Sequence, residues 1–183
     1  TIFKDIFKLL PGELLVKSGK KIEISKFLKF EFSKKKFNND EIKNTIQNKI
    51  QNQLVSDVPI GLSLSGGVDS NIVYSVLRNK YEKKFNIYSF YFSDYEKFNE
   101  DFNVAKKNTN FYESNFVPIK INHNDFIDNA EKVVEILEEP TGNQCSILNY
   151  VMSKNIKEKI LITGDGGDET FTGYDKYRSI YII

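Results

Sequence analysis

Two segments of the chain combine glycines with hydroxyl and carboxylate side chains, and each follows a short apolar run. The first reads Ser-Gly-Gly-Val-Asp-Ser at residues 65–70, and the second reads Thr-Gly-Asp-Gly-Gly-Asp-Glu at residues 163–169. Adjacent glycines let the backbone turn tightly and approach a ligand closely. Both segments are therefore candidates for binding a charged ligand.

The first segment is suited to phosphate or pyrophosphate. A helical pattern follows it, and a helix N-terminus presents unpaired N–H groups and a positive dipole end. Ser65 and Ser70 add hydroxyl donors beside the backbone of Gly66 and Gly67. Asp69 has the wrong sign for phosphate, but it can hold Mg²⁺ that bridges phosphate oxygens. The segment lacks the Gly-Lys-Ser/Thr ending of a Walker A motif, which disfavours γ-phosphoryl transfer. An ordinary Gly-Gly turn with Asp69 or Ser70 as a helix cap is the competing interpretation.

The second segment concentrates three acids, Asp165, Asp168 and Glu169, among three glycines within seven residues. A surface turn is the simple interpretation. A bound divalent cation explains the acids better, because hard cations prefer carboxylate oxygens.

The rest of the chain predicts an α/β fold with a doubly wound, mostly parallel sheet, because apolar strand-like runs alternate with helical patterns. We expect strands at residues 60–64, 86–92, 116–121 and 159–163, and helices at residues 40–54, 71–77, 99–108, 124–137 and 147–156. Two further short strands flank a turn near residues 18–20. Ligands of such sheets bind at the carboxyl ends of strands, where both glycine segments lie.

Composition excludes several other classes of protein. The net charge is +1, and the positive charge is almost entirely Lys, so no nucleic-acid surface is expected. No apolar run approaches the 18 residues of a membrane span, and we expect a cytoplasmic protein. The single cysteine, Cys145, excludes a disulfide framework, and we expect an inert, partly buried thiol. For His123 we expect a capping or surface role.

The chain resembles the glutamine-hydrolysing asparagine synthetase family. The resemblance lies in residues 56–70 around the first glycine segment, in Glu138-Glu139-Pro140, and in residues 163–174 around the second. Other PP-loop enzymes share only the first segment, so the second identifies the family. Residues 9–12 and 20–27 also resemble the end of the family's glutaminase domain.

The resemblance implies a PP-loop ATP pyrophosphatase fold, which is adenine nucleotide alpha hydrolase-like. It implies that residues 1–33 are a C-terminal remnant of a glutaminase domain with its linker, and that residues 38–183 are the N-terminal portion of the synthetase domain. The implied reaction uses ATP and Mg²⁺ to adenylate the side chain of aspartate, releases pyrophosphate, and adds ammonia, normally from glutamine, to give asparagine. A homodimer of the full-length protein is one arrangement left open.

The resemblance also assigns site residues. It places the nucleotide against Leu64, Ser65, Gly66, Gly67, Asp69, Ser70, Phe92, Thr163 and Gly164. It assigns Mg²⁺ to Asp69 and Asp168, and these two join Asp165 as catalytic residues, with Asp165 taking a proton from the attacking ammonia. Glu139 is expected to order the site.

Departures from the family pattern keep alternatives open. Thr1 is no substitute for the family's N-terminal nucleophilic cysteine, so we expect no glutaminase activity. Thr172 replaces the first glycine of the usual Phe-Gly-Gly-Tyr run, and the chain ends before the family's catalytic lysine segment. We interpret the sequence as a fragment or a truncated product. A related amide-forming enzyme such as a β-lactam synthetase, and a non-catalytic ATP-binding remnant, are the alternatives.

Overall fold

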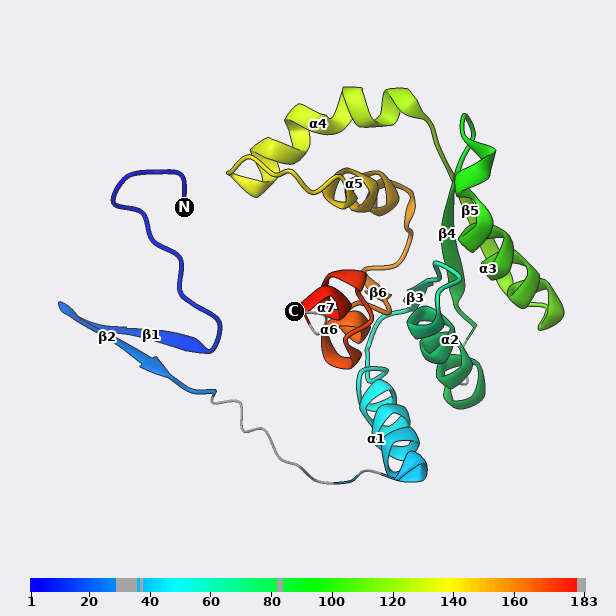
Figure 1. Ribbon diagram of the computed structural model, residues 1–183, viewed down its shortest axis with the longest axis horizontal. Helices are drawn as coiled ribbons and strands as arrows, with labels where there is room; N and C mark the ends of the chain where they lie inside the picture. Colours follow the sequence, from blue (N-terminus) through cyan, green and yellow to red (C-terminus); the bar gives the residue numbers. More distant parts are fainter. Residues whose placement is uncertain (29–35, 37, 82–83, 181–183) are drawn as a thin grey trace.

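A four-stranded parallel sheet forms the centre of the protein. The computed structural model describes residues 1–28, 36, 38–81 and 84–180. The strands run in the order β5-β4-β3-β6, with helices on both faces (Figure 1). Their bounds are β3 (Ile60–Ser63), β4 (Asn86–Phe92), β5 (Asn115–Ile121) and β6 (Ile160–Ile162). These strands confirm the predicted α/β class, and each lies within one residue of its expected start.

The helices divide between the two faces of the sheet. The helices α1 (Asn39–Asn52), α2 (Val68–Lys80) and α3 (Glu100–Phe111) accompany one core cluster, in which Leu62 and Leu77 are fully buried. The helices α4 (His123–Leu137) and α5 (Cys145–Asn155) accompany a second cluster, in which Ile121 is fully buried. Burial on both faces makes the sheet doubly wound, as expected.

Local sequence signals set several helix starts. Asn38 caps α1, because its side chain accepts a hydrogen bond from the backbone N–H of Glu41 at 2.8 Å. Asn122 and Asp125 form a reciprocal capping box at the start of α4. The structure adds three elements that we did not predict, η1 (Glu96–Phe98), α6 (Gly167–Phe171) and α7 (Asp175–Ile180). They are too short to display a helical period in the sequence.

The strand order places a topological switch point between β3 and β6. From β3 the chain steps outward to β4 and β5, and it then returns to pair β6 with the opposite side of β3. The segments that follow β3 and β6 therefore leave the same edge of the sheet next to each other. Open parallel sheets bind ligands at this position.

The N-terminal segment is built differently. The strands β1 (Glu13–Ser18) and β2 (Lys21–Lys26) form an antiparallel hairpin, which confirms the two strands expected there. The hairpin lies apart from the sheet in Figure 1. Its apolar side chains are exposed, and Lys8, before the hairpin, pairs with Glu139 just after the end of α4. The predicted boundary at residues 33–38 falls mostly outside the described residues.

Candidate functional site

The two glycine segments line one polar cavity of about 830 Å³. The first segment, residues 65–70, joins β3 to α2 and is called the β3 loop below. The second segment, residues 163–169, joins β6 to α6 and is called the β6 loop. The side chains of Asp69, Asp165 and Asp168 all line the cavity, so the structure brings the three predicted catalytic carboxylates to one place.

The two loops are in direct contact. A Cβ atom added to Gly167 would lie 2.4 Å from the Cγ of Asp69, and one added to Gly164 would lie 2.8 Å from the backbone nitrogen of Ser70. Both distances are too short for a side chain. The β6 loop therefore needs glycine at both positions in order to lie against the first turn of α2.

Hydrogen bonds hold the β3 loop in shape. The hydroxyl oxygens of Ser65 and Ser70 lie 3.0 Å apart, and the Ser70 hydroxyl donates to the carbonyl of Gly67 at 3.1 Å. The backbone N–H of Gly67 donates to Ser65 Oγ at 3.3 Å. Gly66 has a φ of +93°, which L side chains rarely adopt. These hydrogen bonds and the conformation of Gly66 hold the turn of the loop in place.

Two asparagines that we did not predict also hold this loop. The side-chain amide of Asn71 donates to the carbonyls of Gly66 and Gly67, at 2.8 and 2.9 Å. Asn108 on α3 donates in turn to the Asn71 carbonyl oxygen at 2.8 Å. The position of Asn71 directly after the loop could have indicated its role from the sequence. Asn108 could be found only from the tertiary structure.

The β6 loop is held by hydrogen bonds among its own residues and those that directly follow it. The Thr163 hydroxyl donates to a carboxylate oxygen of Asp165 at 3.0 Å. A Cβ atom on Gly173 would lie 2.0 Å from Asp168 Oδ1, so this glycine leaves room for the Asp168 carboxylate. Thr172 has a φ of +57°, a left-handed conformation that is unfavourable for a β-branched residue.

The pKa of Glu169, at the end of this loop, is clearly shifted. Its own backbone N–H and then the Tyr174 hydroxyl, which donates at 3.0 Å, hold the pKa of Glu169 below its ordinary value. The same hydrogen bond raises the pKa of Tyr174. Glu169 is therefore charged at neutral pH and adds to the negative charge of the cavity.

The donor set of the cavity suits Mg²⁺ bound together with phosphate. Asp69 and Asp168 are half-buried and line the same cavity. Among the described residues, no three His, Cys, Asp or Glu side chains group closely enough to hold a metal by themselves. Mg²⁺ in nucleotide sites typically uses one or two carboxylates and completes its shell with water and phosphate oxygens. Two carboxylates beside an anion-binding loop fit this pattern.

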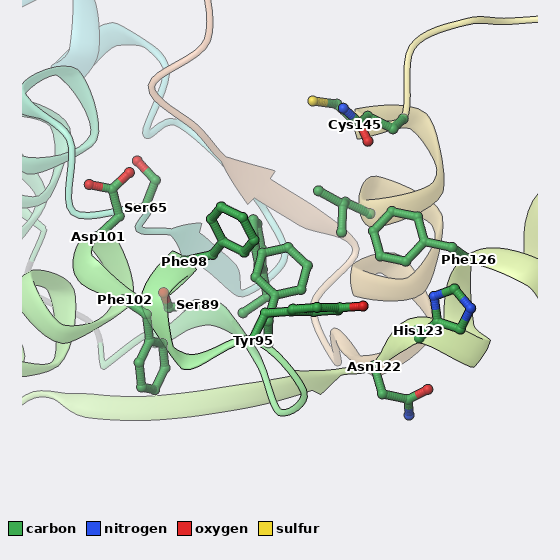
Figure 2. Close-up of a pocket in the computed structure, with 14 residues that line it drawn as sticks. Ser65, Ser89, Tyr95, Phe98, Asp101, Phe102, Asn122, His123, Phe126 and Cys145 are labelled. Atoms are coloured by element: carbon green, nitrogen blue, oxygen red, sulfur yellow. The ribbon is translucent and has the colours of Figure 1, made fainter.

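A second cavity of about 580 Å³ adjoins the first and is mainly aromatic. Phe92 lies at its wall, with its ring 6.4 Å from that of Phe126 and stacked at 20°. Figure 2 shows Tyr95 and Phe98 between the Ser65 end and the Phe126 end of this cavity. Its dimensions and rings suit a flat heterocycle.

The remaining predicted residues are placed as follows. Leu64 is buried in the core, so only its backbone is available to a ligand. His123 is the first residue of α4 and its backbone N–H donates to Asp94 at 2.9 Å, as expected of a residue at a helix start. The expected partial burial of Cys145 was wrong: this residue is exposed, at the start of α5 where it lines the aromatic cavity. Glu139 lies outside both cavities and pairs with Lys8, which lowers the pKa of Glu139.

Comparisons with known proteins point to one family. The family model for asparagine synthase matches residues 41–182. Asparagine synthetase (glutamine-hydrolyzing) 1 of Bacillus subtilis is 28% identical over 140 residues, which are 75% of this chain and 22% of the relative. A Methanocaldococcus jannaschii protein, provisionally named asparagine synthetase (glutamine-hydrolyzing) 2, is 28% identical over 99% of this chain and 36% of its own length. The chain thus spans about a third or less of these curated relatives.

One solved structure is also similar, at a lower level. An NH3-dependent NAD synthetase from Campylobacter jejuni, in complex with nitrate, superposes with a TM-score of 0.48 and 16% identity. It covers 76% of this chain, which covers 62% of that protein. In the part of the chain that the structure describes, no helix is long and apolar enough to cross a membrane.

Proposed function

The chain belongs to the asparagine synthase family, and from this premise we propose that it forms the nucleotide-binding part of an ATP-dependent amide ligase. The substrates of the proposed reaction are ATP, aspartate and ammonia, and the product is asparagine. The observation that carries the proposal is the contact of the β3 loop with the β6 loop at the switch point, with Asp69 against Gly167.

In this proposal, each of the two cavities binds a different part of ATP. The adenine ring occupies the aromatic cavity beside Phe92, and the phosphates occupy the polar cavity above the β3 loop. Backbone N–H groups at the start of α2 and the hydroxyls of Ser65 and Ser70 bind the β- and γ-phosphates. Thr163 and Gly164 border the same space from the side of β6.

The first chemical step forms an acyl adenylate. A side-chain carboxylate oxygen of aspartate attacks the α-phosphorus of ATP, the bond to the oxygen bridging the α- and β-phosphates breaks, and pyrophosphate leaves. The β3 loop stabilises the leaving pyrophosphate because its own hydrogen bonds hold the turn in shape, so little reorganisation is needed. Mg²⁺, held by Asp69 and Asp168 when bound, supplies positive charge that offsets the charge on pyrophosphate.

The second step forms the amide. Ammonia attacks the acyl carbon, and AMP leaves with the electrons of the broken C–O bond. The carboxylate of Asp165, oriented by the Thr163 hydroxyl, takes the proton that the nitrogen loses. Residues 1–33 complete this proposal as the end of a glutaminase domain, which normally supplies the ammonia from glutamine.

The test is aspartate-dependent release of pyrophosphate from ATP by the intact parent enzyme that contains this chain. Asp69→Asn and Asp168→Asn should each lower kcat by about a hundredfold or more, since an amide binds Mg²⁺ far more weakly than a carboxylate. Asp128→Asn, on the exposed side of α4, is the matched control and should leave turnover unchanged. A thermal melt of each variant separates lost chemistry from lost folding.

Two results would contradict the proposal. Near-native turnover by a folded Asp168→Asn variant would remove the role of the β6 loop. Pyrophosphate release that does not depend on aspartate, but depends on another carboxylic acid, would replace aspartate as the substrate and favour a related ligase.

A further inference from the structure

The geometry points to Asp101 as the residue that recognises the ribose hydroxyls of the nucleotide, an inference that rests on the proposed function. Asp101 lies in the first turn of α3, 31 residues beyond the end of the β3 loop in the sequence. Neither the sequence motifs nor the predicted site included it.

Its position at the junction of the two cavities is the first argument. Only Ser65 and Asp101 line both the aromatic cavity and the polar cavity, among the described residues. Figure 2 shows their side chains together at one end of the aromatic cavity. A nucleotide with its base in one cavity and its phosphates in the other must place its sugar where the cavities meet.

The backbone of Asp101 is fixed against the β3 loop. A Cβ atom on Gly66 would lie 2.1 Å from the Asp101 carbonyl oxygen, so the two backbones are already in contact. The side chain is exposed, and no hydrogen bond or ion pair within the described residues engages its carboxylate. Asp101 therefore offers two acceptor oxygens from a fixed backbone position.

The charge of Asp101 determines which part of the nucleotide it can bind. A carboxylate beside a phosphate-binding loop repels phosphate, so its partner must be a donor. It does not join Asp69 and Asp168 in a metal cluster, because no group of three such side chains is found in the described part of the chain. The vicinal hydroxyls of ribose offer two donors at the required place, and an acidic residue binds ribose hydroxyls in the same way in dinucleotide-binding folds.

The experiment measures binding by calorimetry for ATP, 2′-deoxy-ATP and 3′-deoxy-ATP with the purified protein. We expect one or both deoxynucleotides to bind about 10–100-fold more weakly than ATP, as for loss of a hydrogen bond to a charged group. Asp101→Ala should weaken the binding of ATP by a similar factor. It should leave almost unchanged the affinity for whichever deoxynucleotide the unaltered protein binds more weakly than ATP. Glu100→Ala removes the same charge from the same helix turn without lining either cavity, and it should retain the discrimination.

Three results would overturn the inference. If Asp101→Ala weakened the binding of all three nucleotides equally, Asp101 would have a structural or a general electrostatic role. If the unaltered protein bound all three nucleotides equally, it would not recognise the ribose hydroxyls. Both results would leave the aspartate-dependent reaction standing. Absence of any ATP binding would refute the inference and the proposed function together. Discrimination by Asp101 in a protein without aspartate-dependent turnover would refute the proposed function alone.

Discussion

The β3 loop and the β6 loop share a cavity and a glycine-rich composition, but they are held in different ways. The β3 loop is fixed by side chains of α2 and α3 and by contact with the backbone of α3. That backbone leaves no room for a Cβ atom on Gly66. The β6 loop is more exposed, and nothing lies within 4 Å of a Cβ built on Gly166. A fixed loop suits charge stabilisation of a leaving group, while an open loop leaves its acids accessible to substrate.

The largest expected difference is in the stability lost when either of two glycines is replaced by alanine. The two glycines have almost the same φ, +93° at Gly66 and +91° at Gly166. Gly66→Ala combines backbone strain with a clash against Asp101 and should lower the free energy of unfolding by about 3–5 kcal/mol. Gly166→Ala meets only the strain and should cost about 1–2 kcal/mol. Chemical denaturation of both variants measures the difference, and equal losses would mean that the β3 loop is not packed more tightly than the β6 loop.

A smaller effect is expected from the asparagine that fixes the β3 loop. Asn71→Ala removes hydrogen bonds to the carbonyls of Gly66 and Gly67 and should destabilise the protein by about 1–3 kcal/mol. Asn79→Ala, near the exposed end of the same helix, should change stability by less than about 0.5 kcal/mol. If Asn71→Ala matched this control in a denaturant melt, the hydrogen bonds would not be what fixes the loop.

The smallest effect concerns the ionisation of Glu169 in the β6 loop. Its lowered pKa means that the folded state gains stability above the pKa of the unfolded chain and loses that gain as pH falls through the folded pKa. Tyr174→Phe removes the second-largest cause of this lowering, so an NMR titration should show the pKa of Glu169 moving partway back toward 4.5. Tyr177→Phe is the control, and an equal shift in that variant would exclude the Tyr174 hydrogen bond as the cause.

Much of this comparison could be predicted from the sequence, because both loops follow apolar strands and carry their glycines and acids in short, specific patterns. The contacts that distinguish the loops could not. Asn108 and Asp101 meet the β3 loop through the packing of α3, and neither belongs to a local pattern. Part of the lining of the aromatic cavity could be predicted, because strand periodicity places Phe90 and Phe92 on one face of β4. The residues of α4 and α5 that line the same cavity are distant in the sequence and could not be predicted.

The pairing of β6 with β3 also has a consequence for how the site assembles over time. The register joins Ile60 to Ile160, so about a hundred residues must be ordered or looped out before the two strands meet. Closing such a long loop is entropically unfavourable, and β6 offers only three half-buried residues in return. We therefore expect the site to be among the last parts to form on refolding and among the first to open in the native protein. Amide hydrogen exchange should then be faster in β6 than in β3, β4 and β5.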